Sequence, residues 1–118
     1  MTITHGTWGD RHSIFTSDSS IVTVLKLKGS KRCSWHKHAH SFNHFFVISG
    51  VLGIKTDIGN TLLHPGESFT VPPGVFHEFQ TPNSDAIVVE IAYTRYNSGD
   101  IIRQELGGDY ETEQKKNR

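Results

Sequence analysis

Short apolar runs alternate with glycine- and proline-rich breaks along most of the chain, and this pattern predicts strands joined by tight turns. In the first and last runs the apolar positions are nearly continuous, as expected for strands that are covered on both faces or that line a filled barrel. Many short strands in one small domain predict an all-β sandwich or closed barrel. The predicted strands are Ile21–Leu27, Phe45–Ile48, Leu52–Thr56, Thr61–Leu63, Ser68–Val71, Phe76–Phe79 and Ala86–Tyr93.

The chain shows no internal repeat and no linker that would divide it, and 118 residues suit one domain. No window has helical periodicity over its whole length, although Ile101–Leu106 is compatible with one or two helical turns. The last residues, Glu111–Arg118, are charged and unpatterned, which predicts disorder. We therefore expect a domain over residues 1–110 and a tail over residues 111–118.

Charge and composition exclude several classes of partner. Twelve Lys and Arg residues balance twelve Asp and Glu residues, so the chain lacks the basic excess expected of a protein that binds nucleic acid or an anionic membrane. No apolar stretch is long enough for a transmembrane helix, and the first residues do not resemble a signal peptide. The single cysteine, Cys33, rules out an intramolecular disulfide. These features favour a cytoplasmic protein whose partner is a small molecule.

Histidine is unusually frequent: there are eight, and four of them (His36, His38, His40 and His44) fall within nine residues. Imidazole is the commonest metal ligand among side chains. On a strand, His36 and His38 point to the same face and are able to converge on one ion if another strand supplies further ligands. An isolated His-x-His is also compatible with a solvated edge strand. A second segment is therefore needed to distinguish a metal site from such a strand.

That second segment is Gly66–His77, in which Pro72-Pro73-Gly74 forms a rigid turn before a strand that begins with an inward-facing His77. The upstream spacing is His36-x-His38, four residues, Asn43, six residues and Gly50. Together the two segments, within about residues 29–81, resemble the two-motif signature of the cupin superfamily. The resemblance implies a single cupin barrel, which is a jelly roll or double-stranded β-helix.

A closer resemblance extends from about Trp8 to Tyr110, to the C-terminal cupin domain of the type II mannose-6-phosphate isomerase and mannose-1-phosphate guanylyltransferase family. It rests on Trp8-Gly9, on the segments 43–50, 65–68 and 71–77, and on Gly99–Arg103. Three positions depart from that family: His36 stands where Gln is frequent, Asn43 where Glu is usual, and Ser41 where an arginine is usual. The resemblance therefore supports the fold and the metal site more directly than it supports the substrate. It also implies a homodimer.

The resemblance implies a site for one divalent metal ion, with His36, His38 and His77 as ligands. Asn43 either contributes its amide oxygen or stands just outside the ligand sphere. Three neutral imidazoles suit Zn, Fe, Ni, Co or Mn, so the sequence leaves the metal open. With Asn43 in place of a carboxylate the centre is more positive, which favours Lewis-acid chemistry on a carbonyl or hydroxyl oxygen.

Several other residues are candidates for the pocket. His40 and Glu90 are candidates for the catalytic acid or base, whereas Glu78 is expected to be an exposed charge. His44 is expected to face outward because its strand parity is opposite to that of Asn43. The remaining histidines (His5, His12 and His64) are interpreted as surface or loop residues, and the expected pocket lining is Phe45, Val47, Phe69 and Phe79.

Three functions remain open at this point. The first is a metal-dependent isomerase or epimerase that acts on a sugar or a sugar-phosphate-like substrate, since that chemistry needs a Lewis acid and a base. The second is an Fe(II)-dependent dioxygenase, for which three histidines leave open coordination positions. The third is a non-enzymatic cupin that binds a small ligand, which the change of Glu to Asn43 favours.

Overall fold

The structure, a computed structural model, describes residues 1–94, which form ten β-strands and no helix. This confirms the predicted all-β class. Accordingly, none of the described residues belongs to a helix that is able to cross a membrane. The strands are β1 (Thr2–Gly6), β2 (Gly9–Thr16), β3 (Ser20–Leu27), β4 (Lys31–Arg32), β5 (Phe42–Ser49), β6 (Leu52–Thr56), β7 (Gly59–Leu63), β8 (Ser68–Val71), β9 (His77–Thr81) and β10 (Ala86–Tyr93).

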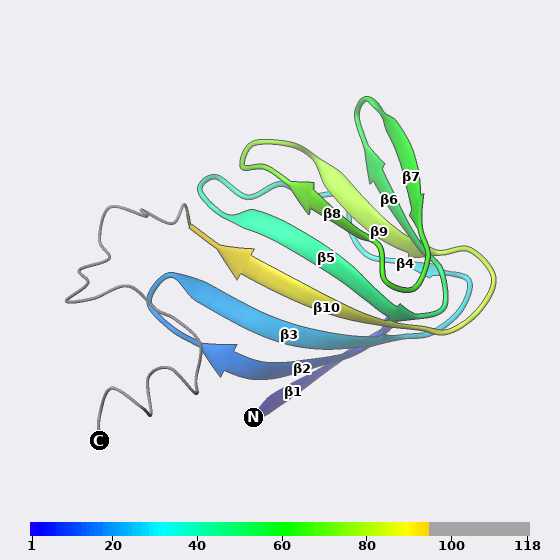
Figure 1. Cartoon of the computed structure of the whole chain (residues 1–118), viewed down its shortest axis with the longest axis horizontal. Helices are drawn as coiled ribbons and strands as arrows, with labels where there is room; N and C mark the ends of the chain where they lie inside the picture. Colours follow the sequence, from blue (N-terminus) through cyan, green and yellow to red (C-terminus); the bar gives the residue numbers. More distant parts are fainter. Residues whose placement is uncertain (95–118) are drawn as a thin grey trace, which may run out of the picture.

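The strands form two antiparallel sheets, one of six strands in the order β1-β2-β3-β10-β5-β8 and one of four in the order β4-β9-β6-β7. The last described strand, β10, lies between β3 and β5, so strands far apart in the sequence are direct neighbours (Figure 1). The chain also passes from one sheet to the other several times. Two sheets connected in this way make the jelly roll that the two motifs imply.

All seven predicted strands are present, with shifts of a few residues at their ends, but β1, β2 and β4 were not predicted. These three strands are largely polar and poorly covered. Every residue of β1 is exposed, as are both residues of β4. Hydrophobic alternation detects a strand through the face that it buries, so a strand that buries little gives little signal. The predicted helical turn at Ile101–Leu106 and the predicted tail at 111–118 lie outside the described residues.

The core lies between the two sheets and becomes polar toward one end. On β5 the inward side chains Val47 and Phe45 are almost completely buried, and the next inward residue is Asn43. On β10 the inward Val88 is followed by Glu90, which pairs with Phe45 across the two strands. The inner face therefore carries apolar side chains at one end and polar, hydrogen-bonding side chains at the other, and the second end is where the histidines meet.

The outer face of the six-stranded sheet keeps several large apolar side chains in contact with solvent. Phe15, Phe46, Ile48 and Ile87 are each more than one third exposed. Strand β10 is therefore apolar on both faces because its inward residues fill the core and its outward residues continue this surface. The homodimer that the sequence resemblance implies stays a prediction, and sedimentation of the protein at several concentrations tests it.

Gly50 explains why the first motif ends in glycine. Its φ is +78°, and a β-carbon added there would run into the carbonyl oxygen of Asp85 and into Ala86. We expect Gly50→Ala to lower the free energy of unfolding by more than about 1 to 3 kcal/mol, because backbone strain and a clash add. The control is Gly66→Ala, where φ is +86° but the space is open. Equal losses in urea unfolding would show that the contact with Asp85 contributes nothing.

Candidate metal centre

His36 and His77 meet because their backbones form an isolated antiparallel bridge. The His36 amide donates to the His77 carbonyl at 3.0 Å, and the His77 amide donates to the His36 carbonyl at 2.8 Å. His36 and His77 pair through a single bridge, so the strand geometry considered for His36 and His38 does not extend to His38. The amide of Gly74 instead donates to the His38 carbonyl at 2.8 Å.

The three imidazoles form a compact cluster. Ring centroids lie 4.5 Å apart for His36 and His77, 5.0 Å for His36 and His38, and 5.5 Å for His38 and His77. One ligand atom from each ring falls within 4.8 Å of the other two. Metal–imidazole bonds are about 2.0 to 2.1 Å long, so nitrogen atoms up to 4.8 Å apart need a small inward movement of the rings to bind one ion. The His₃ cluster can therefore hold a divalent metal ion.

Hydrogen bonds fix which ring nitrogen is free to bind that ion. The Nδ1 atom of His77 lies 3.0 Å from the Val75 carbonyl oxygen, and that of His36 lies 2.7 Å from the Ser34 carbonyl oxygen. A carbonyl only accepts, so each Nδ1 carries the proton and each Nε2 keeps its lone pair. In the described part of the chain, the buried Nε2 atoms of His38 and His77 have no hydrogen-bond partner. An ion between the rings would supply that partner.

Asn43 offers a further candidate ligand, its side-chain amide oxygen. It lies on β5 and is 3% exposed, and its Nδ2 donates to Glu90 Oε2 at 3.1 Å. A carboxylate only accepts hydrogen bonds, so this contact sets the orientation of the amide group and leaves Oδ1 free. That oxygen is buried and has no partner among residues 1–94. Three imidazole nitrogens and one amide oxygen have no hydrogen-bond partner among residues 1–94. These atoms match the metal ligands that the sequence resemblance implies.

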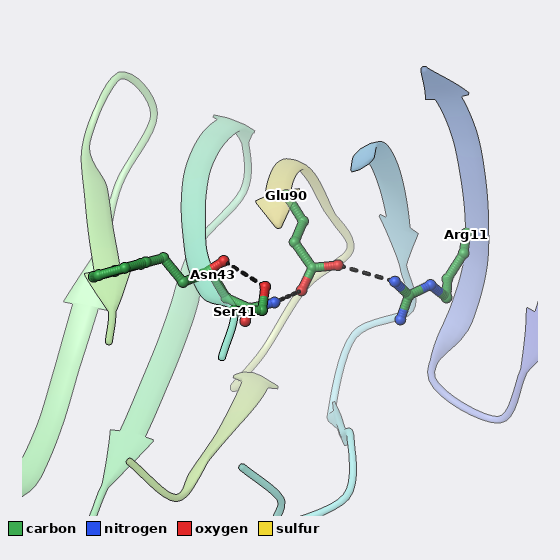
Figure 2. Close-up of polar contacts among 5 residues, drawn as sticks. Arg11, Ser41, Asn43 and Glu90 are labelled. Atoms are coloured by element: carbon green, nitrogen blue, oxygen red, sulfur yellow. Dashed lines mark hydrogen bonds and ion pairs between the residues drawn. The ribbon is translucent and has the colours of Figure 1, made fainter. Parts of the chain in front are cut away.

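Glu90 connects this amide to an arginine, as Figure 2 shows. The carboxylate lies on β10 between Asn43 and Arg11, and its Oε1 atom is 3.0 Å from Nη2 of Arg11. The Glu90 side chain is only 8% exposed, whereas that of Arg11 is 40% exposed. Sequence reasoning missed Arg11 because it lies on the unpredicted strand β2, and neither cupin motif includes it. Only its pairing in the folded sheet could have revealed it.

A cavity of about 390 Å³ opens beside these groups. Such a volume is in the range of small-molecule sites. Among the residues predicted to line it, Phe45 and Phe79 do so, while Val47 lies in the apolar core and Phe69 borders a separate shallow hollow. Further lining comes from the six-stranded sheet and from connecting segments, and it includes Trp8, Arg11, Cys33, Ser41 and Glu90.

The remaining titratable candidates fall outside the cavity. His40 is exposed and does not line it. His44 lies on the outer face and contacts Thr70, as its strand parity predicted. Glu78 was expected to be exposed and is instead 5% exposed, because β9 is an interior strand of its sheet and its carboxylate accepts a hydrogen bond from Gln80. Among the carboxylates of residues 1–94, only Glu90 lines the cavity.

Cys33 lines the cavity without offering a nucleophile. Burial raises the pKa of its thiol to about 11, although a hydrogen bond from the Phe79 amide acts in the opposite direction. The thiol is therefore protonated near neutral pH, and a protonated thiol is a poor nucleophile and a poor metal ligand. The chemistry of the cavity depends on its imidazoles, its amide and its carboxylate.

The metal-free protein should lose stability as the pH falls below about 6.5. Burial lowers the pKa of His77 and that of His38, and the positive charge of His36 lowers both further. The unfolded chain therefore takes up protons near pH 6.5 while the folded protein does so at lower pH, so acid favours unfolding. Urea unfolding in EDTA at about pH 7.5 and about pH 5.5 measures the effect. His77→Gln should reduce this dependence and His44→Ala should not, and an unchanged slope in His77→Gln would contradict the assignment.

The jelly roll and its histidine cluster define the class of the protein, which is a cupin. Solved structures agree: a KdgF from a Halomonas species superposes with a TM-score of 0.72 at 15% identity, covering 81% of this chain and 90% of that one. An RmlC-like cupin from Shewanella frigidimarina gives a TM-score of 0.70 at 21% identity, with coverages of 83% and 87%. At these identities the likeness concerns the fold.

Residues 2–106 match the family described as Mannose-6-phosphate isomerase C-terminal, and the chain belongs to that family. It is 30% identical over 98 residues to a mannose-1-phosphate guanylyltransferase of Sinorhizobium fredii, an alignment that covers 81% of this chain and 19% of the relative. The chain thus spans about a fifth of the length of the curated relatives it matches. The resemblance inferred from the motifs is confirmed at the level of the family.

Proposed function

We propose that this protein is a metal-dependent isomerase or epimerase that acts on a sugar or a sugar-phosphate-like substrate. The observation that carries the proposal is the convergence of three imidazoles beside a cavity whose described lining also includes Asn43, with an amide oxygen that lacks a partner, and one carboxylate. Relatives of the same family act on mannose phosphates by name, which supports a substrate of this kind.

The donor set suits a borderline divalent ion such as Zn, Fe, Ni, Co or Mn, because imidazole and amide oxygen are ligands that these ions accept. When bound, such an ion supplies Lewis acidity toward a carbonyl or hydroxyl oxygen. Burial lowers the pKa of both His38 and His77, which favours the neutral form that binds a metal ion. The aromatic walls from Phe45 and Phe79 would exclude water from one side of the bound sugar.

Glu90 is the proposed group for proton transfer. Isomerisation of an aldose to a ketose moves one proton between the two carbon atoms that exchange the carbonyl, so it needs a base that later acts as an acid. Glu90 is the carboxylate of the described residues that lines the cavity, and its Oε1 atom forms an ion pair with Arg11. His40, the other candidate, is exposed and outside the cavity lining, so we do not assign it this role.

Exchange of the carbon-bound proton in D₂O tests the proposal directly. The protein is loaded with each divalent metal in turn and mixed with aldoses, ketoses and their phosphates, and ¹H NMR follows loss of the signal next to the carbonyl. We expect exchange that needs the metal and that Glu90→Gln abolishes at saturating metal, with Glu78→Gln as the matched control. Absence of exchange across the panel would overturn the isomerase proposal.

The same preparations separate the two alternatives. Oxygen consumption that depends on Fe(II) would replace the isomerase by a dioxygenase. Retention of a small ligand without conversion, detected by native mass spectrometry, would replace it by a binding function. Both results contradict the proposal while leaving the metal centre in place.

A further inference from the structure

Arg11 brings a positive charge into the cavity from a strand that neither cupin motif includes. It lies on β2, and its register partner on β3 is the buried Leu25, so its side chain starts from the inner face of the six-stranded sheet. The guanidinium lines the cavity together with His36, His38 and Asn43. Its side chain is 40% exposed, so it is open to a molecule that enters.

The hydrogen-bonding capacity of Arg11 is largely unused. Within residues 1–94 its side chain makes one polar contact, from Nη2 to Glu90 Oε1 at 3.0 Å. A guanidinium carries five N–H donors in a planar fork, and this shape matches the paired oxygens of a carboxylate or phosphate. One contact with Glu90 fixes the side chain and leaves other donors for a ligand. An arginine held in place in this way is pre-organised for anion binding.

The charge of the site also favours an anion. In the described part of the chain, the cavity is lined by one carboxylate, Glu90, and one guanidinium, Arg11, which compensate each other. The histidine and asparagine ligands are neutral, so a bound divalent ion would leave about two uncompensated positive charges in the cavity. An anion bound beside Arg11 would offset part of that charge.

We propose that Arg11 binds the anionic group, a carboxylate or a phosphate, of a sugar whose other end faces the metal centre. This inference rests on the proposed function because it concerns the same cavity, and it adds the class of substrate: anionic rather than neutral monosaccharides. Arg11 is then a specificity-determining residue, whereas Glu90 and the metal ligands serve the reaction itself.

Binding of three sugars that differ in the group at C6, one neutral and two anionic, tests the proposal. Mannose, mannuronate and mannose 6-phosphate are titrated into the metal-loaded protein by calorimetry. We expect the charged sugars to bind at least about tenfold more tightly than mannose, because a charge-assisted bidentate contact is worth more than about 1.4 kcal/mol. Arg11→Gln should remove this preference, and whichever charged sugar loses more affinity identifies carboxylate or phosphate as the preferred group.

Two further variants keep the test decisive. Arg32→Gln removes an exposed arginine from β4 and should preserve the preference. Arg11→Lys keeps the charge but not the fork, so it should fold like the parent protein and retain only part of the preference. Equal affinity for all three sugars in the parent protein, or an undiminished preference in Arg11→Gln, would overturn the proposal. Turnover is measured separately, so a protein that selects anions without proton exchange refutes the isomerase and leaves the role of Arg11 standing.

Discussion

His38→Ala is expected to bind a divalent metal ion more than about 100-fold more weakly than the parent protein. Loss of a directly bonded ligand should exceed the 10- to 100-fold cost that is typical of removing an outer partner of a ligand. His38 is the appropriate residue to change because it is half-buried and makes no side-chain hydrogen bond within residues 1–94, so its removal leaves the sheets intact. Metal content after dialysis and competition with a chelator give the two affinities.

The matched control is His44→Ala, which removes a histidine from the same cluster in the sequence but from the outer face of the sheet. Its metal affinity should equal that of the parent protein. Cobalt substitution adds a spectroscopic measure, since visible absorption reports the number and type of ligands. If His38→Ala and His44→Ala retain equal amounts of metal, the three imidazoles do not form the centre.

Glu90→Gln is expected to weaken metal binding by about 10- to 100-fold while leaving one ion per chain. The reason lies in the Asn43 amide, whose orientation depends on donating from Nδ2 to the Glu90 carboxylate. Glutamine at position 90 is able to donate as well as accept, so the amide of Asn43 is free to turn and to present nitrogen in place of oxygen to the ion. The Arg11 ion pair is lost at the same time.

Glu78→Gln is the control because it removes a second buried carboxylate whose hydrogen bond goes to Gln80 and not to the donor set. It should bind metal as the parent protein does. Thermal unfolding in EDTA shows whether either variant is merely less stable. If Glu90→Gln and the parent protein share one metal affinity and one cobalt spectrum, Asn43 Oδ1 is not a ligand.

The sequence predicted the fold and the gathering of His36, His38 and His77 because both depend on local signals. The apolar strands of the core alternate with turn residues, and the spacing from His36 to Gly50 carries the first motif. His77, although distant in the sequence, is specified by the rigid turn before it. These features can be recognised in the sequence because each depends on residues that are close together along the chain.

The sequence singled out Asn43 and Glu90 but did not predict their contact with each other or the contact of Glu90 with Arg11. Arg11, Asn43 and Glu90 come from three strands, and their association depends on β10 lying between β3 and β5. No spacing rule encodes that order of strands. The buried position of Glu78 was missed for the same reason, since burial of a polar side chain depends on what covers its strand.

The bridge between His36 and His77 has a consequence for the stability of the protein. Its two residues stand at the ends of a segment that contains β5, β6, β7 and β8, so an ion bound to both would cross-link the ends of four of the ten described strands. Such an ion would act as a removable cross-link. Resistance to heat and to proteases should therefore rise with metal supply.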